Sequence, residues 1–544
     1  MKASDLFVRC LEAEGVKRIF GVPGEENADL MISLIDSNIE FVLCRHEQAA
    51  AFMADAYGRL TGKAGVCLAT LGPGATNLVT GLANANMDRA PVVAIVGQAS
   101  TQRLHKESHQ NMDAMAMFRP ITKWVHTVYT PESIPEIMRK AFNTAEAEKP
   151  GVTVVELPED VAKGNVDDTP MVAMKTRRPA ADRYHRRGAQ PDHPGRQRGL
   201  RKRASAELRR FAHKCGIGVV NTFMGKGSVT MSDPHCLFTM GLQGRDYVNL
   251  AFDDTDVVIT VGYDLVEYAP AFWNAQRDKT IIHIDFDAAE VDQDYPVAVD
   301  IEADLAETLW VLSDELDKRF ADKLPLFDIG GRARLRDDIR ADLETEKEDA
   351  SFPVKPQRIL SDVRGFHGPS DIVLSDVGAH KMWIARYYQC EEPNTCLISN
   401  GFCSMGFALP GAIGAKLAHP ESKMLAICGD AGFLMNVQDL ETAKRLDINI
   451  VIMIWVDGEY GLIKWKQQNQ FDGRHSDLAF ENPDFEMLVK SFGIRGRTLD
   501  GPGQFADALS DAFAESGPAL LAVPVDYDEN RKLTERLGNI VCPI

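Results

Sequence analysis

The chain has 544 residues, of which 45% are hydrophobic and 26% charged, and its formal net charge at pH 7 is −19. It is too long for a single hydrophobic core, and its ordinary globular composition predicts about three or four domains. The acidic balance argues against nucleic acid as a main partner, because nucleic-acid binding needs a basic face.

The sequence predicts a cytoplasmic protein that does not cross a membrane. No uncharged apolar stretch reaches the roughly 18 residues of a membrane span. Asp5, Arg9 and Glu12 make the first residues too charged for the core of a signal peptide. The ten cysteines include no Cys-x-x-Cys pair, so reduced, mostly buried thiols are expected. Cys390 and Cys396 are close in sequence, but we expect neither a zinc site nor a disulfide there.

Residues 1–165 alternate between helix-like and strand-like segments. Apolar spacing predicts helices at 3–15, 27–37, 46–62 and 75–87, and strands at 17–24, 39–45, 64–70 and 91–98. Such alternation predicts a parallel sheet that is covered by helices on both faces. We therefore expect an N-terminal α/β domain over residues 1–165.

The next region is unusual for an acidic protein. Residues 175–205 are strongly basic and almost free of apolar side chains. They are interpreted as part of a solvated linker over 166–205. A nucleic-acid-binding tail and a local sequence anomaly remain alternatives, since an α/β domain would normally open here. A central α/β domain is expected over 206–330, with strands within 216–223, 256–264 and 280–287.

Residues 355–544 repeat the alternating pattern and predict a third α/β domain. Strands are expected within 371–378, 423–430, 448–458 and 519–526, and helices within 406–420 and 437–447. Asn436 is expected to cap the second of these helices, with Asp439 completing a weak capping box.

Two carboxylates follow neighbouring strands of this predicted domain. Asp430 follows "MLAICG" and Asp457 follows "INIVIMIWV", 457 − 430 = 27 residues later. In a βαβ unit both lie at the carboxyl edge of the sheet, where open α/β sheets bind ligands. Two carboxylates with a backbone carbonyl suit magnesium, which in turn binds phosphate oxygens. The alternative is an ordinary acidic turn, because Gly429 and Gly432 permit a tight turn there.

The segment "GDAGFLMN…WVDGEYG" resembles the binding motif of thiamine-diphosphate-dependent enzymes. The resemblance implies that Asp430 and Asp457 bind magnesium through their side chains and that Glu459 binds it through its backbone carbonyl. Two departures are Ala431, a tolerated third residue of the triplet, and Asp457, where many members have Asn. The resemblance also implies the family's fold of three domains, each with a parallel sheet covered by helices.

A second signature, "CRHEQAAAFMADAYGRLTG", places Glu47 just after a predicted strand. Members of the family have a Glu here that bonds a coenzyme ring nitrogen and promotes proton removal from the reactive carbon. A Glu packed among Ala, Phe52 and Met53 is expected to be desolvated, which suits that role. Glu47 is therefore the principal catalytic candidate; the alternative is a helix-capping Glu.

Further residues are implied to bind the coenzyme, and Met405 is implied to bend it. The alternative roles are a helix start for 71–77, a structural histidine at 380 and a core methionine at 405. The full set of expected cofactor-binding residues is Gly72, Pro73, Asn77, Val377, Gly378, His380, Met405, Gly429, Asp430, Ala431, Gly432 and Tyr460.

Several stretches, including "RHEQAAAFMA", "SHQNMDAMAMF" and "VGYDLVEYAPAFWN", resemble the catabolic branch of the acetolactate synthases. This resemblance implies ligation of two pyruvates to 2-acetolactate, in acetoin or branched-chain amino acid biosynthesis. Gln110 is implied to contact the intermediate or the acceptor. Flavin adenine dinucleotide is not expected, because "DVVITVG" is not followed by the Arg-rich signature of flavin-containing relatives.

The resemblance also implies a homodimer or homotetramer with the active site between subunits, since Glu47 and Asp430 belong to different domains. Pyruvate and other 2-keto acids are the expected small-molecule partners, with no nucleic acid and no membrane. The alternatives are another thiamine-diphosphate-dependent decarboxylase or carboligase, a flavin-dependent oxidase of the same fold, and a non-catalytic assembly subunit.

Overall fold

The computed structural model describes residues 1–167, 196–241, 247–253, 255–530 and 533. The chain forms two compact units. The first contains residues 1–197, 401–420 and 436–446, and the second contains residues 198–400, 421–435 and 447–544. Two short stretches of the C-terminal region thus belong to the first unit. The predicted basic segment lies outside the described residues from 175 to 195.

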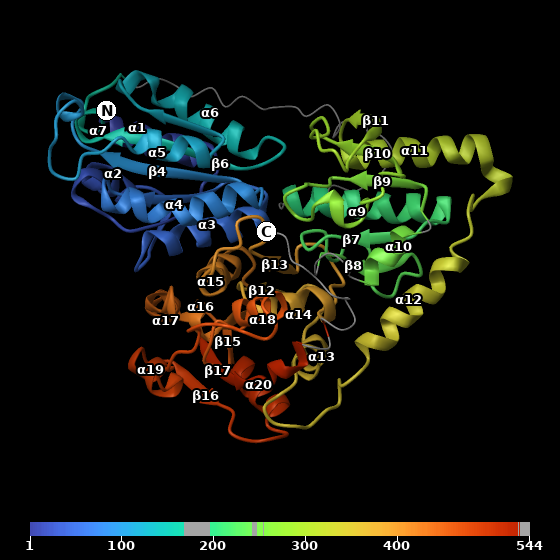
Figure 1. Cartoon of the computed structure of the whole chain (residues 1–544). Helices are drawn as coiled ribbons and strands as arrows, with labels where there is room; N and C mark the ends of the chain where they lie inside the picture. Colours follow the sequence, from blue (N-terminus) through green and yellow to red (C-terminus); the bar gives the residue numbers. More distant parts are fainter. Residues whose placement is uncertain (168–195, 242–246, 254, 531–532, 534–544) are drawn as a thin grey trace. The chain divides into compact units, whose positions relative to one another are not determined.

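The first unit is built on a six-stranded parallel sheet with the order β2-β1-β3-β4-β6-β5. Its strands β4 and β6 are labelled in Figure 1. Strands β3, β4 and β6 are buried along their whole length, as expected for apolar strands in a parallel sheet. The strand bounds are β1 Arg18–Gly21, β2 Glu40–Leu43, β3 Gly65–Ala69, β4 Val92–Gln98, β5 Trp124–Thr127 and β6 Val152–Pro158.

Small residues allow the helices of the first unit to approach closely. Helix α3 packs against α4 and α15. A Cβ atom on Gly414 of α15 would lie 2.2 Å from the backbone oxygen of Met53 in α3. The helices are α1 Ala3–Ala13, α2 Ala28–Ile35, α3 Glu47–Thr61, α4 Pro73–Met87, α5 Ala114–Phe118, α6 Ile134–Glu146, α7 Glu159–Lys163, α15 Ala408–Ala418 and α17 Leu440–Arg445.

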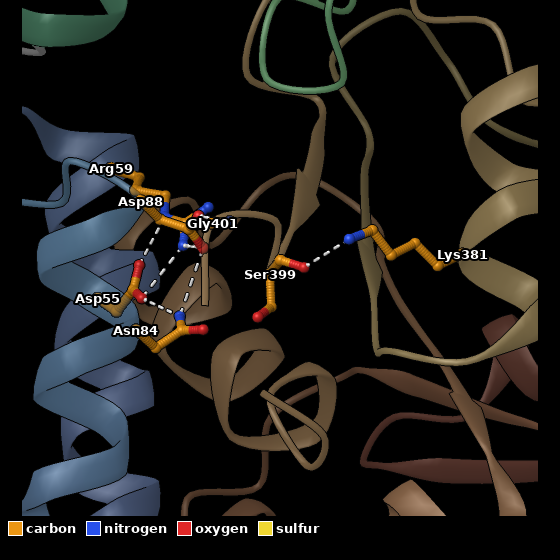
Figure 2. Close-up of polar contacts among 7 residues, drawn as sticks. All are labelled: Asp55, Arg59, Asn84, Asp88, Lys381, Ser399 and Gly401. Atoms are coloured by element: carbon orange, nitrogen blue, oxygen red, sulfur yellow. Dashed lines mark hydrogen bonds and ion pairs between the residues drawn. The ribbon is translucent and has the colours of Figure 1, made fainter. Parts of the chain in front are cut away.

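A buried ionic network joins α3 and α4 (Figure 2). Arg59 donates to Asp55 at 2.5 Å and to Asp88 at 2.7 Å, and all three side chains are at most 1% exposed. Asn84 donates to Asp55 at 2.9 Å, and Asp88 accepts the backbone N–H of Gly401 at 2.6 Å. Buried charges are tolerated when they are paired and hydrogen-bonded, as here. The network therefore fixes the start of the segment that leads to α15.

The second unit contains three sheets, and all of their strand pairs are parallel. The largest has the order β13-β12-β14-β15-β17-β16, which repeats the order of the first unit's sheet when each is numbered from its own first strand. The others are β11-β10-β9 and β7-β8. The strands are β7 Val219–Asn221, β8 Cys236–Thr239, β9 Val257–Val261, β10 Thr280–Asp285, β11 Val297–Glu302, β12 Ile372–Ser375, β13 Cys396–Ile398, β14 Met424–Gly429, β15 Val451–Val456, β16 Arg495–Thr498 and β17 Ala519–Pro524.

Helices of the second unit bury their apolar faces against these sheets. Helix α14 packs on β12 and β14, and the buried Lys381 of this helix donates to the backbone oxygen of Ser399 at 3.2 Å (Figure 2). The helices are α9 Arg196–Cys215, α10 Leu250–Asp253, α11 Leu305–Phe320, α12 Gly330–Leu343, α13 Pro356–Phe366, α14 Ala379–Tyr387, α16 Asp430–Leu434, α18 Gly461–Gln470, α19 Phe485–Ser491 and α20 Phe505–Ala514.

Short 3₁₀ helices complete both units. They are η1 Glu25–Asn27, η2 Thr101–Arg103, η3 Arg119–Ile121, η4 Pro131–Ser133, η5 Tyr247–Asn249, η6 Pro270–Phe272, η7 Ala321–Lys323, η8 Val437–Asp439 and η9 Tyr527–Glu529. Among the described residues, no helix has both the length and the apolar character that crossing a bilayer requires.

The predicted class, parallel sheets covered by helices, is confirmed, and local details differ. Helix α9 begins at Arg196, inside the segment predicted as a linker. The predicted domain boundaries stay predictions. The predicted capping role of Asn436 is wrong, because its side chain makes no capping hydrogen bond and a 3₁₀ turn precedes α17. Both cysteines of the pair Cys390 and Cys396 are free and buried.

Candidate active site

In the first unit, Glu47 is the first residue of α3 and follows β2 after three residues. The N-terminus of this helix is capped by His46, whose Nδ1 accepts the backbone N–H of Gln48 at 3.1 Å. The Glu47 side chain is buried, and its Oε2 accepts a hydrogen bond from Nδ2 of Asn77 in α4 at 2.9 Å. Two residues predicted from separate motifs are thus in direct contact.

The glycine turn before α4 lies against Gln110, which belongs to a third predicted motif. Gly72 has φ +52°, in the left-handed region, and Pro73 occupies the first turn of α4. A Cβ atom on Gly72 would lie 2.7 Å from the backbone oxygen of Gln110, and one on Gly74 would lie 3.3 Å from Oε1 of Glu47. Gln110 is exposed and also adopts a positive φ of 57°. Glycine at these two positions therefore permits the close approach of Gln110 to Gly72 and of Glu47 to Gly74.

Met405 lies half-buried in the segment that joins Gly401 to α15. The segment begins at the hydrogen bond between Asp88 and Gly401, and its carbonyl at Gly406 accepts Nδ2 of Asn436 at 2.8 Å. Both ends of the short loop that carries Met405 are therefore fixed by side chains of the first unit.

In the second unit, Asp430 is 1% exposed and begins α16 directly after β14. Its Oδ2 accepts the backbone N–H groups of Asp457 at 3.2 Å and Gly458 at 2.8 Å, and Nδ2 of Asn482 at 2.8 Å. Its Oδ1 accepts the N–H of Ala431 at 2.9 Å. The expected proximity of the two strand ends is observed, and Asp430 is the residue that links them.

Burial, and then the charge of Asp430, raise the pKa of Asp457 to about 7. A Cβ atom on Gly461 would lie 2.4 Å from Oδ2 of Asp457, so a side chain at this position would displace the carboxylate. The carboxylate of Glu459 forms an ion pair with the ammonium group of Lys464 at 2.6 Å. The backbone carbonyl of Glu459 accepts only the N–H of Gly461 among the described residues. The buried carboxylate of Asp430, the half-buried one of Asp457 and this carbonyl form a hard-oxygen donor set that fits a divalent cation.

No group of three or more His, Cys, Asp or Glu side chains suited to a metal occurs in the part of the chain that the structure describes. A site that uses two carboxylates and a backbone oxygen is consistent with this finding.

The turn after β12 lies beside the turn after β14, because the two strands are neighbours in the sheet. The chain passes from β12 to β13 on one side and later returns to β14 on the other side of β12. Open α/β sheets bind ligands at such a switch point. A Cβ atom on Gly378 would lie 2.7 Å from the ring of His380, and one on Gly429 would lie 3.4 Å from it. Glycine turns of this kind, followed by helix N-termini, suit phosphate groups.

His380 is 1% exposed, and burial lowers the pKa of its imidazole to about 4. Its Nε2 is buried and has no hydrogen-bond partner among the described residues. An unpaired buried nitrogen beside two glycine turns fits a bound polar ligand such as a diphosphate. Tyr460, by contrast, is 39% exposed, and its ring packs edge-on against Phe480.

The sequence interpretation missed three side chains around the acidic pair. Asp376 is fully buried at the end of β12, and its Oδ1 accepts the N–H of Val377 at 2.7 Å. Asn482 binds Asp430. Burial, followed by the charges of Asp457 and Asp430, raises the pKa of Tyr527. Only Asp376 carried a visible signal, an acidic residue before a glycine turn at a strand end.

The predicted residues are thus found in two groups. The first unit contains Glu47, Gly72, Pro73, Asn77, Gln110 and Met405. The second unit contains Val377, Gly378, His380, Gly429, Asp430, Ala431, Gly432, Asp457, Glu459 and Tyr460. Their roles in binding and catalysis stay predictions.

Comparison with known proteins identifies the family of the chain. Three family profiles of thiamine pyrophosphate enzymes match the chain: the N-terminal TPP binding domain over residues 1–117, the central domain over 197–312 and the C-terminal TPP binding domain over 376–523. The acidic pair and the two glycine turns lie within the last match, and Glu47 lies within the first.

Similar curated proteins extend over almost the whole chain. An acetolactate synthase of Bacillus subtilis (strain 168) is 35% identical over 98% of this chain and 94% of its own length. A catabolic acetolactate synthase of Raoultella terrigena is 35% identical over 98% of this chain and 97% of its own. The large subunit of acetolactate synthase isozyme 2 of Escherichia coli (strain K12) is 34% identical over 97% and 96%. The chain belongs to the acetolactate synthase family of thiamine pyrophosphate enzymes.

Proposed function

We propose that this protein synthesises 2-acetolactate. In this reaction one pyruvate loses carbon dioxide, and its remaining two-carbon unit forms a carbon–carbon bond to the keto carbon of a second pyruvate. One observation carries the proposal: the buried Glu47–Asn77 pair occurs in a chain that aligns end to end with acetolactate synthases.

Bound thiamine diphosphate supplies the electron sink that decarboxylation of a 2-keto acid requires. Glu47 holds a proton for a ring nitrogen of this coenzyme. Asn77 occupies Oε2, which leaves Oε1 as the oxygen that would carry the proton. The buried position of the carboxyl group excludes water from this proton.

The diphosphate of the coenzyme would be held through Mg²⁺ in the second unit. Asp430, Asp457 and the backbone carbonyl of Glu459 would be the protein ligands of this ion. Oδ1 of Asp430 accepts one N–H whereas Oδ2 accepts three donors, so Oδ1 is the oxygen available to the metal. The glycine turns at Gly378 and Gly429 and the imidazole of His380 would bind the phosphate oxygens.

Gln110 lies against the turn at Gly72 and is exposed, which leaves its amide free to meet the second substrate. An amide donates to a carboxylate or keto oxygen without changing the charge of the site. Pyruvate is the proposed donor and acceptor, and other 2-keto acids are further candidate acceptors.

The proposed assembly is a homodimer or homotetramer with each active site between two subunits. Some relatives, such as the one from Escherichia coli, are named large subunits. No flavin takes part in the proposed reaction.

An assay with pyruvate, Mg²⁺ and thiamine diphosphate, without added flavin, tests the proposal. We expect acetolactate and carbon dioxide from the wild-type protein. Replacing Glu47→Gln should reduce kcat roughly 10²- to 10⁴-fold. The matched control is Glu132→Gln, an exposed glutamate of the same unit, which should be fully active. Acetaldehyde as the main product would identify a decarboxylase instead, and equal activity of both variants would remove Glu47 from the mechanism.

A further inference from the structure

Asn436 and Asp439 bind two loops of the first unit instead of capping a helix. Nδ2 of Asn436 donates to the carbonyl of Gly406 at 2.8 Å. Oδ1 of Asp439 accepts the backbone N–H of Arg45 at 3.1 Å and the hydroxyl of Thr442 at 2.9 Å. Each side chain therefore fixes one backbone group that is distant in sequence.

The loop bound by Asp439 is the one that leads into α3. Arg45 precedes Glu47 by two residues, between the end of β2 and the capping residue of the helix. The same stretch is bound at a second point, because Thr442 and Arg445 both donate to the carbonyl of Leu43. The position at which the chain enters α3 is thus set by η8 and α17.

The loop bound by Asn436 carries Met405, the residue directly before Gly406. At its other end, Gly401 is held by Asp88 of the buried ionic network. Phe407, which follows Gly406, packs edge-on against Phe52 of α3 with ring centroids 5.6 Å apart. Asn436 therefore restrains the residue that directly follows Met405.

Asp439 is a costly group to bury. Its side chain is fully buried, and its Oδ2 has no hydrogen-bond partner among the described residues. Burial raises the pKa of this carboxyl to about 6. An unpaired buried oxygen weakens a fold. Stability therefore does not explain this carboxylate, whereas the restraint on Arg45 does.

We propose that Asp439 and Asn436 are positioning residues of the active site: Asp439 sets the place of Glu47 through Arg45, and Asn436 sets the place of Met405 through Gly406. The inference rests on the proposed function, since it assigns these residues to the same reaction.

The first test compares Asp439→Leu with Asp439→Asn. Leu removes the acceptor for Arg45, whereas Asn keeps an oxygen at Oδ1 and removes the buried charge. Hydrogen–deuterium exchange of the coenzyme-free protein is measured in a peptide that spans residues 41–52. We expect faster exchange in the Leu variant and wild-type exchange in the Asn variant. Lys444→Gln, an exposed residue of α17, is the control and should leave the exchange unchanged.

Kinetics provide the second readout. Because a small displacement of a catalytic group lowers the rate sharply, Asp439→Leu should reduce kcat roughly 10- to 100-fold with the KM for pyruvate little changed. Asp439→Asn should restore most of that loss. Wild-type exchange or wild-type kcat in the Leu variant would overturn the inference, as would a loss that the Asn variant does not relieve.

Asn436→Asp tests the proposed role of Asn436 without a change in side-chain size. It also provides a test of the inference if the Asp439→Leu variant fails to fold. It removes the donor to Gly406, so faster exchange over residues 401–410 and weaker coenzyme binding by calorimetry are expected. Unchanged exchange and affinity would contradict the role of Asn436.

A wild-type protein that makes no acetolactate would overturn the proposed function itself. The exchange rates are measured without coenzyme, so they separate the two failures.

Discussion

Asn482 shows how one neutral side chain supports a proposed metal ligand. It donates to Oδ2 of Asp430, and its own Oδ1 is buried without a partner among the described residues. Side chains that orient metal ligands typically change metal affinity about 10- to 100-fold when they are removed. We expect Asn482→Ala to weaken Mg²⁺-dependent coenzyme binding by about tenfold, as measured by calorimetric titration of magnesium. Asn469→Ala, an exposed asparagine of α18, is the control, and equal magnesium affinity of the two variants would contradict the prediction.

His367 provides a pH-dependent contribution to stability outside the candidate site. Burial lowers the pKa of its imidazole from 6.5 to about 4. Between these values the unfolded chain binds the proton and the folded chain does not, so stability is present above pH 6.5 and is lost as the pH falls toward 4. Over this range the free energy of unfolding of the wild type, measured by urea denaturation, should fall by up to about 3 kcal/mol more than that of His367→Phe. The control His105→Phe, at an exposed histidine, should keep the wild-type dependence of stability on pH. The same pH dependence in His367→Phe and the wild type would disprove the effect.

Sequence reasoning at single positions succeeds where a residue follows a strand directly. Asp430 and Asp457 both follow apolar strands of one βαβ unit, and the structure joins them by hydrogen bonds. Asn482 and Tyr527 could not be found in this way. They reach the acidic pair from later segments of the chain, and no spacing rule relates those segments to it.

Close packing of α3 against α15 depends on glycine. A Cβ atom on Gly414 would lie 2.2 Å from a backbone oxygen of α3, which cannot move aside as a flexible side chain can. Gly414→Ala should therefore destabilise the protein by about 1–3 kcal/mol, as expected for overpacking. Gly365→Ala is the matched control, because a Cβ atom on Gly365 in α13 meets nothing within 4 Å. Since alanine favours helix, that variant should be unchanged or slightly more stable in urea unfolding. The same sign for both variants would contradict the packing argument.

Helices and strands with strong apolar periodicity were predictable, and the elements that depend on tertiary contacts were not. Strands β4, β14 and β15 lie within the predicted segments because unbroken apolar runs favour buried parallel strands. The segment after Asn436 was predicted as one helix and instead forms η8 and α17. Its polar side chains bind distant backbone groups, a competition that local sequence cannot show.

The division of the chain into units was not accessible from the sequence. Residues 401–420 and 436–446 fold with the N-terminal sheet, although they are separated from it by more than 200 residues. Long-range packing of α15 on α3 decides this arrangement, and a glycine such as Gly414 does not by itself indicate which helix it contacts. The repeated strand order of the two large sheets likewise becomes visible only from their pairing.

The proposed assembly makes a quantitative prediction for mixed subunits. If Glu47 of one subunit and Asp430 of another complete each site, chains carrying Glu47→Gln and chains carrying Asp430→Asn are both inactive alone. When they are co-expressed, random pairing makes half of the dimers mixed, and each mixed dimer contains one intact site of its two. Acetolactate synthesis should then recover to about 25% of the wild-type rate per site. The matched control combines Asp430→Asn with Asp457→Ala, two variants of the same metal site, and should recover nothing. Native mass spectrometry verifies that the co-expressed Glu47→Gln and Asp430→Asn chains form mixed dimers. If these mixed dimers make no acetolactate, each subunit forms its active site alone.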